Sequence, residues 1–292
     1  MPARLDRFLR RPAPFARSTA DRRATGRRRR ALLGLAATLA LGLGGATALP
    51  AGGAEETVVV LGGYHFPPYV ESGPSNGGGL SLALMDALNS LESPYRFKFF
   101  KTSPARRHVD FQRGRYDVAF LESPAWGWRQ RDIAYTATPP LLRGREVYVA
   151  RAEAAARDAV FAEPAARSLA GFIGYHYAVT GMETDPERLR TDYDIMLNTS
   201  HERNLQALHN GRVDLAIVTE AFLERYRHQH PDIASALAVG PEPDHTYTLR
   251  GLVSPSAPIE AATLTRLLAR LSERGDLDPI LARFKVAEDW RL

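Results

Sequence analysis

Cysteine is absent from all 292 residues of this chain. Its absence excludes disulfide bonds, cysteine-ligated metal sites, a thiol nucleophile and a lipid-modified N-terminal cysteine. The folded protein must then rely on a packed apolar core, and a chain of this length buries enough surface to form one. The sequence also lacks the Gly-x-Ser-x-Gly, His-Glu-x-x-His and phosphate-loop motifs, so the enzyme classes that carry them are not indicated.

Acidic residues are nearly missing from the N-terminal segment. The first 54 residues contain 11 of the 38 Lys and Arg residues but only two of the 33 acidic residues. Arg27–Arg30 precede an uncharged apolar run, 31–43, and small residues up to Ala54 follow. This order predicts a secretory signal peptide over 1–54, because a membrane span needs about 20 apolar residues. The paired arginines leave both the general and the twin-arginine export routes open.

The formal net charge of +5 depends on this segment, and the rest of the chain carries −4. The sequence after residue 54 therefore does not indicate nucleic-acid binding, since no stripe of Lys and Arg residues remains in it. The pair His228 and His230 lies at the end of a predicted helix without a third ligand, which favours solvated surface over a metal site. We expect a monomeric protein of a bacterial periplasm, with no metal, no cofactor and no nucleic-acid partner.

Two segments about a hundred residues apart are alike: Gly114–Asp117 and Gly211–Asp214. Each follows a helix-like stretch and precedes a short apolar run that ends at an acidic residue, Glu122 or Glu220. Glycine just past a helix tolerates the left-handed conformation that caps it, and a short buried strand fits a parallel sheet. The repetition predicts two similar α/β lobes whose loops face one small-molecule cleft.

The periodicity of apolar residues gives the order of the elements. It predicts strands over 55–61, 95–100, 118–121, 145–151, 172–175, 193–197, 213–218, 236–239 and 246–254. It predicts helices over 80–91, 106–113, 185–190, 200–210, 220–228, 259–274 and 277–284, with a linker or loose helix over 152–166. The fold class is therefore α/β, with each lobe a sheet flanked by helices and two hinge strands crossing between the lobes. We place lobe 1 at 55–148 and 250–292, and lobe 2 at 149–249.

Four segments resemble the bacterial solute-binding proteins of family 3, the periplasmic polar-amino-acid-binding type. They are the aromatic-Pro-Pro-aromatic loop Phe66–Tyr69, Gly79 with Leu84–Asp86, the first repeat Gly114–Asp117, and Arg129–Thr136. The resemblance covers nearly all of the chain after the signal peptide. It implies a two-lobed periplasmic-binding-protein-like fold, a small polar solute, and an inner-membrane ABC permease or a sensor as the partner.

The resemblance also implies that Arg129 holds a ligand carboxylate. Arg129 stands twelve residues after Asp117 and six before Tyr135, which is the family's spacing. A guanidinium binds a carboxylate through two parallel, charge-assisted hydrogen bonds. The alternative is a surface arginine, which is our interpretation of Arg131.

Aromatic residues supply the next candidates. Tyr64 and Phe66 adjoin the stiff Pro67-Pro68 loop, where rings stack on a ligand or pack onto their own lobe. Trp126 forms a wall of the site or packs inside the lobe, with Trp128 beside it. His176 stands where members of the family commonly have a Gly-Thr turn, so we include it among the contacts.

Two acids and one hydroxyl complete the predicted site. Glu122 and Glu220 end corresponding strands, where ligands bind in open α/β sheets. Either acid receives a ligand cation or has a local role: Glu122 as a partner of Arg129, Glu220 as a helix-start acid. Thr219 stands where the family often has an amine-binding aspartate, so a standard α-amino acid is not indicated.

Two functions fit these patterns. The first is a binding protein whose lobes close over a small polar, carboxylate-bearing solute. The second is a periplasmic enzyme that resembles the cyclohexadienyl dehydratases, with Glu122 or Glu220 as the proton donor. Product formation from prephenate separates them.

Overall fold

The computed structural model describes residues 56–71, 78–157 and 159–292. The predicted signal peptide and its cleavage position lie outside these residues. The chain divides into the unit Met1–Gly52 and the unit Gly53–Leu292, and the described residues belong to the second. Within the described ranges, no helix combines the length and the apolar character that a bilayer crossing requires.

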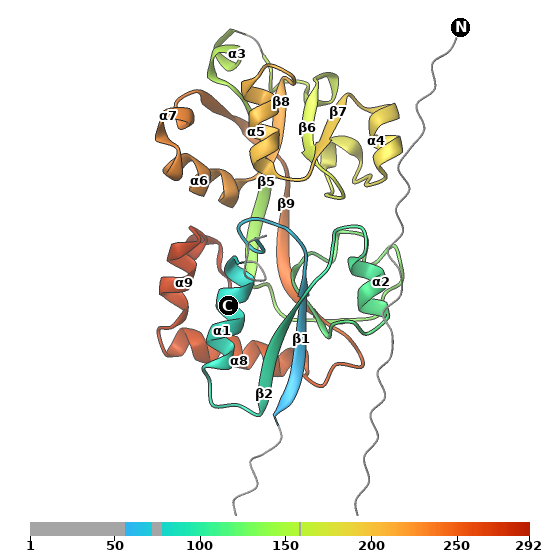
Figure 1. Cartoon of the computed structure of the whole chain (residues 1–292), viewed down its shortest axis with the longest axis vertical. Coiled ribbons are helices and arrows are strands. Elements are labelled where there is room, and N and C mark those ends of the chain that lie inside the picture. The colour runs from blue at the N-terminus through green and yellow to red at the C-terminus, as the bar shows by residue number, and fades with distance from the viewer. Residues whose placement is uncertain (1–55, 72–77, 158) are drawn as a thin grey trace, which may run out of the picture. The chain divides into compact units, whose positions relative to one another are not determined.

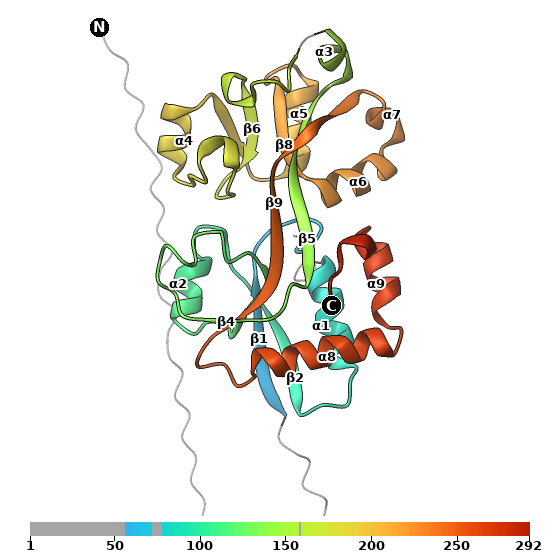
Figure 2. The same ribbon diagram turned by 180° about the vertical axis from the view of Figure 1, so that it is seen from behind.

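The second unit contains two groups of helices and strands, joined by the long strands β5 and β9 (Figure 1). The first group is a sheet in the order β2-β1-β3-β9, in which β1 runs parallel to β2 and β3 and β9 runs antiparallel. Helices flank this sheet, and α8 lies across it in the view from behind (Figure 2). The elements are β1 (Thr57–Gly63), α1 (Leu80–Asn89), β2 (Tyr95–Lys101), α2 (Arg107–Gln112), β3 (Val118–Glu122), β4 (Thr136–Ala137), α8 (Ala261–Glu273) and α9 (Leu277–Arg283).

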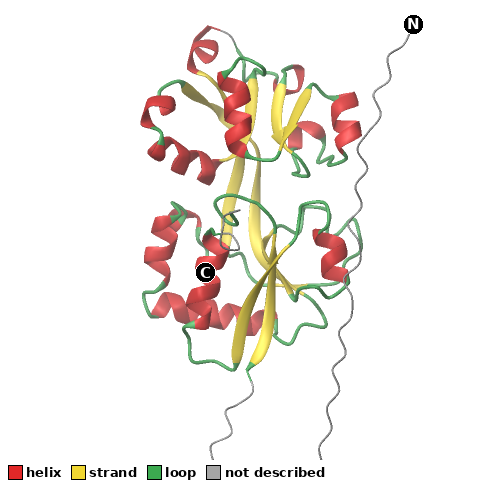
Figure 3. Ribbon diagram, viewed as in Figure 1, coloured by secondary structure: helices red, strands yellow, loops and turns green. Residues whose placement is uncertain are grey.

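The second group is a sheet in the order β5-β8-β6-β7, with helices around it (Figure 3). Strand β6 runs parallel to both β7 and β8, whereas β5 runs antiparallel to β8 and β9. Val147 and Val149 of β5 pack with Leu205 and Phe222 in its core. The elements are β5 (Leu142–Arg151), α3 (Ala152–Arg157), β6 (Leu169–Phe172), α4 (Pro186–Asp192), β7 (Ile195–Asn198), α5 (His201–His209), β8 (Leu215–Thr219), α6 (Glu220–Gln229), α7 (Pro231–Ala234) and β9 (Leu237–Val253).

Strand β9 corrects the sequence prediction. The sequence predicts separate strands over 236–239 and 246–254, and Pro241 and Pro243 lie between them. The structure has one strand of 17 residues that pairs with β5 through shifts of register near these prolines. The irregular pairing accommodates residues that donate no backbone hydrogen bond. Our boundaries at 148/149 and 249/250 fall inside β5 and β9 and stay a proposal.

The strand predicted over 172–175 is also misplaced. Strand β6 ends at Phe172, and the following residues turn towards the cleft. The short strand β4 and helix α7 were not predicted, since two and four residues are too few to show a period.

The repeated Gly-Arg-x-Asp units adopt the same structure. Gly114 and Gly211 have φ values of 65° and 69°, and each follows the last turn of a helix. The amides of the two residues after each cap bond back to carbonyls of the last turn, which forms a Schellman motif. Asp117 then accepts a hydrogen bond from the amide of Val60 at 2.7 Å, and Asp214 accepts one from Ser168. Each aspartate thereby fixes its strand to the neighbouring one.

The left-handed glycine gives a first prediction. We expect Gly211→Ala to lower the free energy of unfolding by about 1–2 kcal/mol, because a Cβ disfavours this conformation. Space is not the cause, since the nearest atom to the added Cβ lies at 3.7 Å. Chemical denaturation measures the loss. Arg212→Ala, at an exposed position of the same turn, is the control, and equal effects of the two variants would contradict the cap.

Candidate ligand site between the lobes

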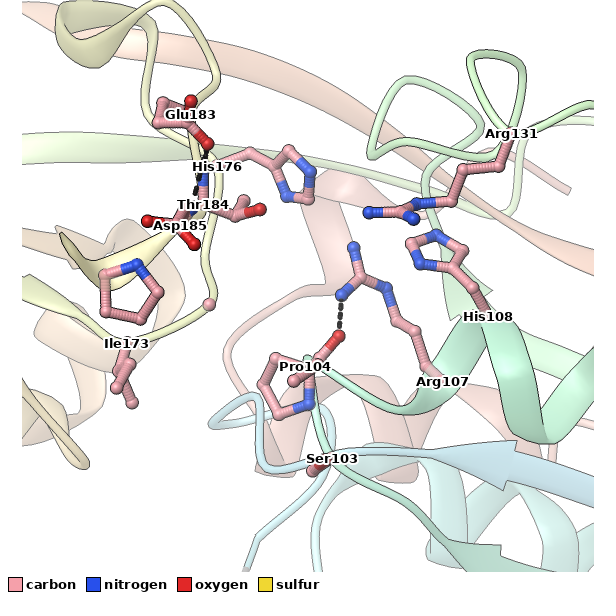
Figure 4. Close-up of a pocket in the computed structure, with 13 residues that line it drawn as sticks. Ser103, Pro104, Arg107, His108, Arg131, Ile173, His176, Glu183, Thr184 and Asp185 are labelled. Atoms are coloured by element: carbon pink, nitrogen blue, oxygen red, sulfur yellow. Dashed lines mark hydrogen bonds between the residues drawn. The ribbon is translucent and has the colours of Figure 1, made fainter. Parts of the chain in front are cut away.

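A cavity of about 510 Å³ lies between the two lobes (Figure 4). Lobe 1 lines it with the segment that begins α2 and with Arg131, and lobe 2 lines it with the loops after β6 and before α4. Its volume is in the range of small-molecule sites. The lining residues are Ser103, Pro104, Ala105, Arg107, His108, Arg131, Ile173, Gly174, His176, Glu183, Thr184, Asp185 and Pro186.

Arg107 is the buried cation of this cavity, with 3% of its surface exposed. Its guanidinium donates to the carbonyl oxygens of Pro104 and Trp126, the latter at 3.0 Å, and lies 5.1 Å from the ring centre of Tyr64. The Nε atom lies 3.5 Å from a carboxylate oxygen of Glu122. A guanidinium has five N–H donors, so these contacts fix its position and leave donors for a ligand.

Glu122 lies behind Arg107 rather than in the cavity. A bulge of β3, in which Leu121 has a φ of 54°, precedes it. Bulges next to functional sites change the direction of a side chain. Burial raises the pKa of the Glu122 carboxyl to about 7, although Arg107 beside it acts in the opposite direction. Arg129 is one of the partners that the sequence leaves open for Glu122, whereas the partner in the structure is Arg107.

The two arginines of the predicted segment differ in their position relative to the cavity. Arg129 is exposed on the turn after β3 and is not among the residues that line the cavity. Arg131 is exposed, which agrees with our interpretation of it as a surface residue, and it also lines the cavity. Figure 4 shows the guanidinium groups of Arg107 and Arg131 turned towards the same space as the ring of His176. The role of Arg129 as the carboxylate contact stays a prediction.

The carboxylates of the lobe 2 wall already have partners. Glu183 accepts from the amides of Thr184 and Asp185 and pairs with Arg188 at 2.9 Å. Asp185 caps α4 by accepting from two backbone amides. Glu183 is therefore paired with a cation and Asp185 is held by backbone amides, while Arg131 has no ion pair among the residues that the structure describes. The Arg131 guanidinium is therefore available to bind an anionic group.

Tyr64, Phe66 and Trp126 lie together at the inner end of the cleft. Phe66 contacts Trp126 and Tyr175 edge-to-face, with ring centres 5.4 and 5.5 Å apart. The Tyr175 hydroxyl donates to the carbonyl of His65 at 2.8 Å, which joins the two lobes. The structure thus brings three of the predicted aromatic contacts to the cleft.

His176 is part of both the cavity and this aromatic cluster. Its ring lies nearly parallel to that of Trp126, with centres 6.4 Å apart. Burial and then the charge of Arg107 lower the pKa of His176 to about 3, so the ring is neutral at physiological pH. A neutral imidazole leaves the positive charge of the site to the arginines.

Thr219 and Glu220 do not line the cavity. Thr219 is fully buried, where it accepts a hydrogen bond from His201 at 3.0 Å and donates to Glu146 at 2.9 Å. Glu220 begins α6 and pairs with Arg145, at a separate surface depression. The local role that we left open for Glu220, a helix-start acid, matches this position.

Sequence reasoning did not select Arg107, His108 or Glu146. Arg107 and His108 were inside a predicted helix, where a charged residue is ordinarily solvated. The available signal is Ser103-Pro104, which lies between a strand end and that helix in a turn that lines the cavity together with Arg107 and His108. Among the described residues, no group of three or more His, Cys, Asp or Glu side chains is placed to hold a metal ion.

No family model and no curated protein sequence matches the chain, but solved structures do. A substrate-binding protein of an ABC uptake transporter from Streptococcus pneumoniae with bound histidine aligns over 78% of this chain and 92% of its own, with 12% identity and a TM-score of 0.62. The ligand-binding core of GluR0 from Nostoc punctiforme with L-glutamate aligns over 77% and 98%, with 13% identity and a TM-score of 0.59.

A third similar structure is an ancestral amino-acid-binding protein described as a precursor of cyclohexadienyl dehydratase. It aligns over 78% of this chain and 94% of its own, with 14% identity and a TM-score of 0.56. Identities this low establish the fold and not the ligand. The protein has the two-lobed fold of the amino-acid-binding proteins of ABC transporters.

Proposed function

We propose that the protein is a periplasmic solute-binding protein that captures a small, carboxylate-bearing solute between its lobes. The observation that supports this proposal is the interlobe cavity, which Arg107 and Arg131 line from lobe 1. On the lobe 2 wall, Glu183 is paired with Arg188 and Asp185 caps α4. The ligand stabilises the closed arrangement because it contacts both lobes, and β5 and β9 are the hinge. Delivery to an ABC permease or presentation to a sensor completes the proposed role.

The first experiment identifies the solute. A thermal-shift screen covers amino acids, small carboxylates, amines and short peptides, since a ligand at 100 times its dissociation constant stabilises the folded protein by about 2.7 kcal/mol.

Small-angle scattering with the ligand from this screen then tests the hinge. An unchanged scattering profile at saturation would count against closure of the two lobes. Absence of any stabilising carboxylate would argue against the proposed function.

Binding by point variants decides which arginine holds the carboxylate. We expect Arg131→Ala to weaken binding by about 1.5–3 kcal/mol, the value of hydrogen bonds to a charged group. Arg129→Ala tests the family spacing, and Arg113→Ala, at an exposed position beyond α2, is the control. Calorimetry measures all three. A large loss in Arg129→Ala with none in Arg131→Ala would restore the prediction from sequence and contradict the placement in the cavity.

An enzymatic role is the second candidate, and one observation supports it. Burial raises the pKa of the Glu146 carboxyl to about 8, so a protonated acid lines the inner end of the cleft. Such an acid has the protonation state of a general acid at neutral pH. Glu122 and Glu220, the donors considered from sequence, line neither part of the cleft. Incubation with prephenate tests this role, and absence of product would exclude the dehydratase reaction.

A further inference from the structure

A second, much smaller chamber adjoins the arginine-lined cavity. Tyr64, Phe66 and Trp126 form its lobe 1 wall, and Tyr175 and His176 form its lobe 2 wall. Glu146 of β5 and His245 of β9 line it from the hinge strands. Its volume is about 10 Å³, which is close to the space that one water molecule occupies. His176 lines both the chamber and the cavity, so the two spaces are neighbours.

Two buried polar atoms of the chamber have no hydrogen-bond partner among the described residues. They are Oε2 of Glu146 and Nε2 of His245. Glu146 is 2% exposed, and its other oxygen accepts from Thr219. The two residues are register partners on adjacent antiparallel strands, so their side chains lie on one face of the sheet. A buried polar atom without a partner costs about 1–3 kcal/mol, so a bound group that satisfies both is favoured.

His245 presents an acceptor to this chamber. Its Nδ1 lies 2.8 Å from a carboxylate oxygen of Asp244, which also accepts from the backbone amide of Ala178. Because that carboxylate accepts, Nδ1 carries a hydrogen, and Nε2 of an imidazole with a single N–H is then an acceptor. The chamber therefore offers one carboxylate oxygen, one imidazole nitrogen and the faces of aromatic rings, a combination suited to a positively charged nitrogen.

We propose that this chamber is the subsite for a terminal primary ammonium group of the solute, with Glu146 and His245 as its hydrogen-bond acceptors. The inference rests on the proposed function, because the arginine-lined cavity next to it holds the anionic end of the same molecule. The substrate class is then an amino carboxylate whose ammonium enters the hinge. A primary ammonium has the size of a water molecule and donates to both acceptors. A trimethylated nitrogen has no donor and exceeds the space.

The protonation of Glu146 agrees with this assignment. Burial raises the pKa of the Glu146 carboxyl to about 8, so Oε2 carries a hydrogen at neutral pH. When the ligand binds, the Glu146 carboxyl releases that proton to the solvent and the ammonium takes its place. The net charge of the chamber therefore stays the same on binding. A bound ammonium therefore offsets the free-energy cost of a buried Glu146 carboxylate. A solute without nitrogen offers no such charge, so the Glu146 carboxyl stays protonated.

The test compares three matched sets of ligands by calorimetry on the unaltered protein. The first set is glycine, 4-aminobutanoate and 6-aminohexanoate, the second contains their N-trimethylated forms, and the third contains the acids without nitrogen. At one chain length at least, we expect the primary amine to bind about 30-fold or more tightly than both matched compounds. Glu146→Gln should reduce this preference to about twofold, because the amide cannot balance the charge of the ammonium. Glu242→Gln, at an exposed position of β9, is the matched control.

Several results would overturn the assignment. The primary amines gain nothing over the acids without nitrogen if a water molecule is the natural occupant of the chamber. Equal or tighter binding of the trimethylated forms contradicts the size argument. An amine preference that survives Glu146→Gln places the ammonium elsewhere. Binding of carboxylates that depends on Arg131 without any amine preference refutes only the subsite, whereas failure of every carboxylate refutes the proposed function as well.

Discussion

Replacement of Arg107 by alanine is expected to lower the free energy of unfolding by about 3–5 kcal/mol at pH 8. Arg107 is buried against Glu122, whose carboxyl has a pKa of about 7 and is ionised at pH 8. Removing the guanidinium leaves this carboxylate in the core without its counter-charge. At pH 5 Glu122 is protonated in the folded protein, so the same variant should cost clearly less.

The pair Arg107 and Glu122 also supplies its own control. The double variant Arg107→Ala with Glu122→Gln has no buried charge at this position, so it should recover part of the stability that Arg107→Ala loses. Denaturant titration at the two pH values measures both effects. A cost that is equal at pH 5 and pH 8, without recovery in the double variant, would attribute the loss to packing rather than to the ion pair. Binding of the solute should fail in Arg107→Ala in either case, because Arg107 also lines the cavity.

The sequence predicts the fold well because the fold depends on local patterns. The helix over 261–273 buries Leu264, Leu267, Leu268 and Leu271 at helical spacing, and the two glycine caps and their aspartates repeat the same backbone bonds. The prediction of two strands in place of β9 is wrong because β9 pairs with β5, far away in the sequence. This pairing extends the strand across Pro241 and Pro243, which locally disfavour a strand. The helices and strands can therefore be predicted from the sequence, but the irregular pairing of β5 with β9 cannot.

The site is less predictable because direction and burial decide it. Arg129 and Arg131 differ by two positions on one turn, and only the path of that turn determines which of them lines the cavity. Glu146 belongs to a strand that local pattern predicts correctly, but nothing in the sequence shows that one of its oxygens is buried without a partner. Tyr64, Phe66 and Trp126 do line the inner chamber, because a stiff loop and a strand end limit where such rings can lie; their contact with a ligand stays a prediction.

Glu146 should make the empty protein less stable as the pH rises, and Glu146→Gln should remove this dependence. The folded-state pKa of about 8 lies above the ordinary value of 4.5. Between these values the folded chain holds a proton that the unfolded chain has released, so the free energy of unfolding falls with increasing pH. From pH 6 to pH 8.5, we expect the unaltered protein to lose about 2–3 kcal/mol relative to Glu146→Gln.

The comparison of two proteins is needed because other groups titrate in the same range. Burial lowers the pKa of His201 to about 3, so the unfolded chain gains a proton below pH 6.5 that the folded chain lacks, and stability falls towards acid. His176, His201, His245 and Asp244 are among the titratable groups around Glu146 and its partner Thr219, and all are shared by both proteins. Their contributions therefore cancel in the difference. Denaturant titration at pH 6, 7 and 8.5 gives this difference directly. A difference that stays constant over this range would mean that the Glu146 carboxyl is already ionised in the folded protein. A ligand ammonium would then have no proton on Glu146 to replace.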